Sequence, residues 1–170
     1  MKTALRFGVV FLLIGLISCT KESPADLTTT GLRQFLTDDF SFKYATDATF
    51  DIQGERENIL RTFLISGPEI EIDSTMVAAY FMEIKVYEYN GEEIRNFIHE
   101  LFHGNLVQNE GNVRIRGREA LRFETSKNGE KYIHTGFITG GKAVIASIVV
   151  NSWSPLSIYY LTLDSFRFPN

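Results

Sequence analysis

The sequence predicts an α+β domain in which helices pack on an antiparallel β-sheet. Most of the chain beyond residue 39 alternates apolar and polar residues, a pattern typical of half-buried strands. Two dipeptides, Asn128-Gly129 and Gly140-Gly141, separate such segments and favour tight hairpins. The apolar spacing changes to the helical period in two places. Strands, helix, strands and helix therefore follow one another, as expected for an α+β fold.

The first part of the domain is predicted to consist of strands. Alternation begins over residues 39–52 as a hairpin-like opening, and it continues over residues 59–65 before a Ser-Gly-Pro turn. Residues 76–89 form a long run of β-formers that ends at Asn90-Gly91. The residues of this run expected on one face are Tyr80, Met82, Ile84 and Val86.

A helix is predicted after this run, because apolar residues recur there at the spacing of one helical face. Gly104-Asn105 is expected to end it. A second helix is predicted near the C-terminus, where Ser154 and Pro155 suit the N-cap and the first turn. The inward-facing residues are expected to be Ile94, Phe97, Ile98, Leu101 and Phe102 in the first helix, and Leu156, Tyr159, Tyr160 and Leu163 in the second.

The segment between the two helices is predicted to be an antiparallel meander. Alternation resumes after Asn112 and continues as far as residue 123. Further strands are expected over residues 132–139 and 142–150. Because the two glycine-containing dipeptides make tight turns between these strands, consecutive strands should pair with each other.

The N-terminus has the features of a secretory signal. Lys2 and Arg6 precede an apolar run over residues 7–16. The sequence Leu16-Ile17-Ser18-Cys19 that follows resembles the bacterial lipoprotein box, in which signal peptidase II cuts before a lipidated cysteine. The resemblance implies that Cys19 becomes a lipidated N-terminus carrying diacylglyceryl and further acyl chains such as palmitate.

Three regions follow from this interpretation. Residues 1–18 are expected to be the signal peptide, residues 19–35 the lipidated N-terminus and a flexible tether, and residues 36–170 the globular domain. The protein is then expected in the cell envelope, anchored to a bacterial membrane through the lipid on Cys19, with its domain extracytoplasmic. Because Cys19 is the only cysteine, the chain cannot form an internal disulfide.

Charge argues against nucleic acid as a partner. Without Lys2 and Arg6, the 17 basic residues fall to 15 against 21 acidic ones, so the processed chain carries a net charge of −6. A mildly acidic surface repels phosphate backbones and mainly serves solubility. The abundance of aromatic residues, with 14 Phe and 7 Tyr, is typical of a packed globule.

Several segments together resemble the PsbP-like domain, an α-β-α sandwich. They are residues 40–44 (Phe-Ser-Phe-Lys-Tyr), the first predicted helix, residues 117–121 (Gly-Arg-Glu-Ala-Leu), the two hairpins, and Ser165-Phe166 after the last helix. The likeness covers most of residues 36–168. It implies a binding or accessory module without catalysis or cofactor, whose partner is an unknown envelope protein or a small ligand.

One motif indicates different chemistry. Residues 99–103 (His-Glu-Leu-Phe-His) match H-E-x-x-H, in which His99 and His103 would hold zinc and Glu100 would act as the base of a metallopeptidase. On a helical wheel with Ile94 at 0°, however, the apolar stripe centres at about 10°, while the two histidines lie at about 140° and 180°. They are therefore expected on the wet face of the helix, away from any cleft. His134, in a strand, is expected to be a surface residue or a satisfied polar residue.

The remaining candidates are four arginines of one parity. If they line one face of a strand, their positive charges favour binding of an anionic ligand, although charged residues on the solvated side of a sheet are common without any ligand. These residues are Arg114, Arg116, Arg118 and Arg122. The function that fits the whole sequence is a lipid-anchored binding or accessory module of the envelope. A zinc metallopeptidase and a purely structural envelope protein remain as alternatives.

Overall fold

The computed structural model describes residues 31–169, so the predicted signal peptide and Cys19 lie outside the described residues. The elements in chain order are β1 (Leu32–Leu36), β2 (Ser41–Ala45), β3 (Thr49–Gln53), β4 (Ile59–Ser66), β5 (Glu69–Ile72), β6 (Thr75–Ala78), β7 (Phe81–Glu88), α1 (Ile94–Leu101), β8 (Gln108–Ile115), β9 (Arg118–Lys127), β10 (Glu130–Thr139), β11 (Lys142–Val150) and α2 (Leu156–Ser165). Within this part of the chain, no helix is long and apolar enough to cross a membrane.

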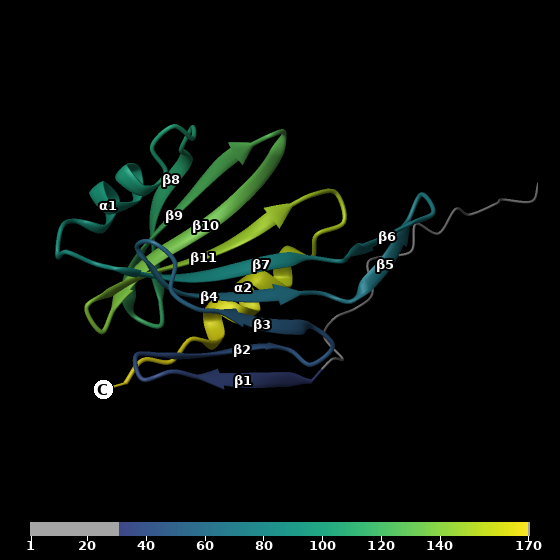
Figure 1. Cartoon of the computed structure of the whole chain (residues 1–170), viewed down its shortest axis with the longest axis horizontal. Coiled ribbons are helices and arrows are strands. Elements are labelled where there is room, and N and C mark those ends of the chain that lie inside the picture. The colour runs from purple at the N-terminus through teal and green to yellow at the C-terminus, as the bar shows by residue number, and fades with distance from the viewer. Residues whose placement is uncertain (1–30, 170) are drawn as a thin grey trace, which may run out of the picture.

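A seven-stranded sheet forms the middle layer, in the order β3-β4-β7-β11-β10-β9-β8. All of its neighbouring strands are antiparallel. In chain order, β3, β4 and β7 come first, and α1 then connects β7 to the far edge of the sheet. From that edge β8, β9 and β10 follow one another back towards the centre (Figure 1). Strand β11 therefore closes the sheet by pairing with β7 at its centre. The pairs β1-β2 and β5-β6 form separate two-stranded ribbons.

One face of the sheet is covered by α2 and by the β1-β2 ribbon. Aromatic rings fill this layer, since the ring of Phe42 lies 5.7 Å from that of Phe63 and 5.5 Å from that of Phe166. Backbone hydrogen bonds between Ser41 and Arg167, of 2.8 and 2.9 Å, join β2 to the segment that follows α2. These contacts bury the larger of the two hydrophobic clusters of the domain.

The opposite face is covered in part by α1. Ile98 is completely buried there, and Phe97 and Phe102 pack against the same smaller cluster. A Cβ atom on Gly136 of β10 would come within 2.7 Å of Ile98 Cδ1. The missing side chain therefore lets the helix approach the sheet closely, and the apolar stripe predicted for the first helix is confirmed.

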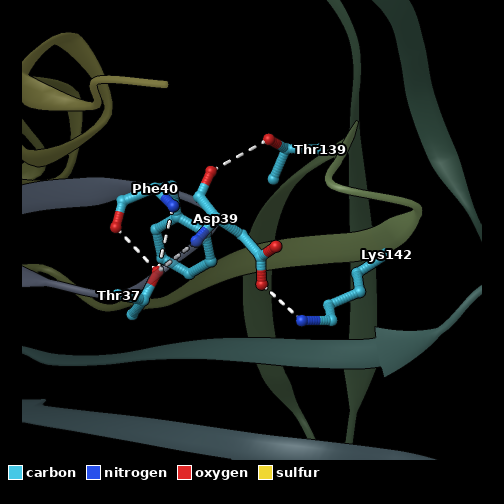
Figure 2. A network of polar contacts seen from close by, with 5 residues as sticks. All are labelled: Thr37, Asp39, Phe40, Thr139 and Lys142. Atoms are coloured by element: carbon cyan, nitrogen blue, oxygen red, sulfur yellow. Dashed lines mark hydrogen bonds and ion pairs between the residues drawn. The ribbon is translucent and has the colours of Figure 1, made fainter. Parts of the chain in front are cut away.

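The loop before β2 is fastened to the β10-β11 hairpin (Figure 2). Within the loop, the Thr37 hydroxyl donates to the carbonyl oxygen of Phe40 at 2.7 Å and accepts from its N–H at 3.0 Å. Across to the hairpin, Thr139 donates to the carbonyl oxygen of Asp39 at 3.2 Å, and Lys142 forms an ion pair with the Asp39 carboxylate. This network fixes the end of the β1-β2 ribbon relative to the sheet.

The predicted α+β fold class, with helices packed on an antiparallel sheet, is confirmed, as is the meander of β9, β10 and β11. Both residues of each predicted tight turn have positive φ, 54° and 84° at Asn128-Gly129 and 56° and 71° at Gly140-Gly141. Such turns match the twist of the strands that they connect.

Three boundaries differ from the prediction. Strand β1 begins at Leu32, inside the expected tether at residues 19–35, because its backbone pairs with β2. The expected strand over residues 76–89 is interrupted at Ala79-Tyr80, since its first part belongs to the β5-β6 hairpin. In α2 the N-cap is Pro155 and not Ser154, whose Oγ lies 2.6 Å from Asn151 Oδ1 and 3.0 Å from Val149 O.

Candidate functional site

Beside α1, the same face of the sheet is hollowed into an open cavity of about 700 Å³, which we call the open-face hollow. Its floor comes from β7, β9, β10 and β11, and its rim from the C-terminal end of α1 and from the β9-β10 hairpin. The polar floor residues are Glu83, Lys85, Thr125, His134 and Ser147, and the rim includes Leu101, Phe102, Asn105, Lys127 and Glu130. A hollow of this size accommodates a drug-sized molecule.

Strand pairing explains why these polar residues meet. Ser147 of β11 lies opposite Glu83 of β7 on one side and opposite His134 of β10 on the other. Residues directly opposite each other in a sheet point to the same face. The three side chains therefore form a polar row across the centre of the sheet, on the face that carries α1.

His134 is the centre of a buried hydrogen-bonded network. Its Nδ1 lies 2.7 Å from Ser147 Oγ and its Nε2 lies 2.8 Å from Thr125 Oγ1, and only 4% of the residue is exposed. Because a neutral imidazole has one donor and one acceptor nitrogen, one hydroxyl accepts a hydrogen bond and the other donates one. The polar groups of this network are thereby satisfied.

Burial, followed by the nearby charge of Lys85, lowers the pKa of His134 to about 4. The ring also lies among aromatic side chains, with centroids 4.8 Å from both Phe123 and Phe102. Desolvation of this kind disfavours the charged imidazolium. At neutral pH, His134 is therefore a neutral hydrogen-bonding residue and a weak base.

Charges of both signs surround this network. The Lys85 ammonium lies 2.7 Å from a Glu83 carboxylate oxygen, and about a third of each side chain is exposed. On the rim, the Tyr132 hydroxyl donates to Glu130 at 2.6 Å, which raises the pKa of Tyr132 to about 12. The hollow therefore combines a balanced set of charges with hydroxyl, amide and aromatic groups.

The three candidate zinc-site residues, His99, Glu100 and His103, are not among the residues that line this hollow. Helix α1 ends at Leu101, so His103 belongs to the turn after it, and His103 and Glu100 are both exposed. His99 is also exposed, and its Nε2 lies 2.7 Å from a carboxylate oxygen of Glu110. Among residues 31–169, no three His, Cys, Asp or Glu side chains come together as a metal site would require.

Glu100 lies in a second surface depression of about 580 Å³, which is mainly acidic. Its other carboxylates come from Glu57, Glu88 and Glu92. Glu100 and His99 therefore have different surroundings, since His99 is paired with Glu110 of β8 while Glu100 lies among a different group of residues.

The four arginines do not lie on one face of the sheet, although their common parity in the sequence had suggested a shared face. Arg116 sits in the turn between β8 and β9 with a φ of 50°, and this turn reverses the chain. Arg114 pairs with Glu119 on the α1 side of the sheet, whereas Arg118 and Arg122 lie over Phe168 and Tyr160 on the α2 side. They therefore do not form a single anion-binding site.

Sequence reasoning missed the open-face hollow. A partial signal was present in β7, because Glu83 and Lys85 point away from the face of that strand that carries Met82, Ile84 and Val86. Such polar residues are ordinarily assigned to solvent. His134 was expected to be a surface residue or a satisfied polar residue, and its burial and two hydrogen bonds agree with the second alternative only.

Comparison with solved structures relates this geometry to known proteins. The structure is similar to that of cyanobacterial PsbP (CyanoP) from Synechocystis, with a TM-score of 0.55 and 12% identity, covering 86% of this chain and 98% of that one. It is also similar to a crystal structure from Bacteroides thetaiotaomicron, with a TM-score of 0.52 and 18% identity over 81% of this chain. The chain spans about half, 48%, of that protein. These likenesses show a PsbP-like fold.

No protein-family model and no curated protein sequence matches the chain.

Proposed function

We propose that this protein is a lipid-anchored, extracytoplasmic binding or accessory module of the bacterial cell envelope, and that the open-face hollow is its binding site. The observation that carries the proposal is that α1 leaves part of the sheet uncovered over a polar, hydrogen-bonded floor. A buried polar network needs every member satisfied, and here three side chains satisfy one another. Such a rigid floor suits recognition of a molecule in the hollow.

The chemistry of the floor supports binding in preference to catalysis. A general base works best when its pKa lies near the working pH, whereas burial lowers the pKa of His134 to about 4. Both ring nitrogens are already occupied by hydroxyls, and the group beyond Nε2 is Thr125 and not a carboxylate. Ser147 therefore has a histidine beside it but lacks the carboxylate that orients and supports that histidine in serine hydrolases.

The anchor is proposed from the sequence at Leu16 to Cys19, which lies outside the described residues. A diacylated and N-acylated cysteine provides more than one acyl chain, and two such signals give stable membrane attachment. Eleven residues lie between Cys19 and Gly31, where the described part begins. Extended, they reach roughly 40 Å, so the domain would stay near the membrane surface.

Position-specific photocrosslinking tests the binding site. A photoreactive amino acid at Lys127, on the rim of the hollow, is expected to give a discrete adduct in cells of the bacterium that makes the protein. The matched control places the same amino acid at Lys43, which is also exposed but lies on β2, across the sheet. An adduct at Lys43 alone, or no adduct at Lys127, would show that the hollow is not the binding site.

A further inference from the structure

We infer that the ligand of the open-face hollow is a neutral saccharide, a short glycan whose hydroxyl groups contact the rim and whose ring stacks on its aromatic side chains. This inference rests on the proposed function, because it assigns a chemical class to the same site. Three properties of the hollow carry it: its charge balance, its hydrogen-bonding groups and its aromatic surfaces.

The charges that line the hollow cancel. Lys85 and Lys127 contribute two positive charges, and Glu83 and Glu130 contribute two negative ones. Lys85 is paired with Glu83 at 2.7 Å, and Glu130 accepts from the Tyr132 hydroxyl. An anionic ligand would have to compete with Glu83 for Lys85, and a cationic ligand with Lys85 for Glu83. Charge complementarity therefore favours a ligand without net charge.

The available hydrogen-bonding groups include both donors and acceptors. Asn105 presents an amide that has no side-chain partner among residues 31–169. Asn151 uses its Oδ1 to accept from Ser154 Oγ at 2.6 Å, which leaves its amide N–H groups for a ligand. A ligand hydroxyl both donates and accepts, so it can satisfy either type of group. A molecule with several hydroxyls matches this mixture better than a simple acceptor.

Aromatic rings provide the apolar part of the surface. Phe81 and Phe102 line the hollow and are only half-buried, and Tyr132 is half-buried in the same wall. An entirely apolar ligand would leave the Glu83 and Lys85 charges covered without new partners, which is costly. The faces of a sugar ring are apolar while its edge carries hydroxyls, so a saccharide suits both parts of the lining.

Titration with defined sugars tests this inference on the full chain, kept in a detergent without a sugar headgroup. The probes are glucose, N-acetylglucosamine, cellobiose and maltose, with the dipeptide Gly-Ala and glucuronate as zwitterionic and anionic comparisons. Amide chemical shifts identify the residues affected.

We expect at least one neutral sugar to bind with a dissociation constant in the micromolar to millimolar range and to shift residues of the hollow. Asn105→Ala should weaken binding by about fivefold to tenfold, since it removes a hydrogen bond to the ligand. Asn96→Ala, which removes the same amide from an exposed position of α1 outside the hollow, should leave binding unchanged.

The outcomes separate the two claims. If Gly-Ala or glucuronate shifts the hollow and the neutral sugars do not, the hollow is a binding site but the saccharide assignment is wrong. If sugars shift residues elsewhere, or if Asn96→Ala weakens binding as much as Asn105→Ala, the assignment also fails. If no probe shifts the hollow and the Lys127 photocrosslink is absent, the saccharide inference and the proposed site fail together.

Discussion

Acid should destabilise this fold through His134. The pKa of its imidazole is about 4 in the fold against an ordinary value of 6.5. Between these two values the unfolded chain binds a proton that the folded chain excludes, so the stabilisation is present above pH 6.5 and is lost as the pH falls towards 4. Because each pKa unit corresponds to about 1.4 kcal/mol, the loss amounts to about 3 kcal/mol.

Urea melts of the wild type and of His134→Gln, at several pH values between 7.5 and 4.5, measure this effect. Glutamine cannot titrate, so the difference in unfolding free energy between the two chains should shrink by about 2 to 3 kcal/mol across that range. Most carboxylates are common to both chains and cancel in the difference. His103→Gln removes a histidine from an exposed position and is the control. A difference that stays constant with pH would refute the desolvation argument for His134.

Three further predictions concern the helix, the anchor and the zinc motif. Ile98→Ala should lower the unfolding free energy by about 2–5 kcal/mol, because the side chain is completely buried, whereas His103→Ala should change it by less than about 0.5 kcal/mol in the same melts. Cys19→Ala should abolish incorporation of labelled palmitate, and equal labelling of both chains would exclude the anchor. The purified chain should bind less than one zinc per molecule and should cleave no casein. Tightly bound zinc with cleavage that Glu100→Gln abolishes would instead establish the peptidase.

Local signals explain which parts of the fold were predictable. Asn128-Gly129 and Gly140-Gly141 both adopt the positive φ values of two-residue hairpin turns. These four residues were therefore enough to predict the meander of β9, β10 and β11. The apolar stripe of α1 is equally local. The β5-β6 hairpin was missed because its turn, Asp73-Ser74, reaches φ values of 49° and 65° without a glycine.

The candidate site, in contrast, depends on contacts between segments that are far apart in the sequence. Parity failed for the arginines because the turn at Arg116-Gly117 restarts the alternation on the opposite side. The open-face hollow exists because α1 ends at Leu101 and leaves His134 and Ser147 beside it, and this depends on helix length and on the pairing of strands far apart in sequence. Polarity on a strand face cannot by itself distinguish a solvated surface from the floor of a cavity.

The late closure of the sheet by β11 has a consequence for folding during synthesis. Until residues 142–150 are available, β7 has one edge whose backbone donors and acceptors are unpaired, while β3 and β4 already cover the other. An unpaired central strand with an apolar face is a template for pairing between chains. Pairings this distant in sequence form slowly, because a long loop must close first. Newly emerging molecules should therefore depend on a holding chaperone, and truncation before residue 142 should yield aggregates in place of a smaller folded domain.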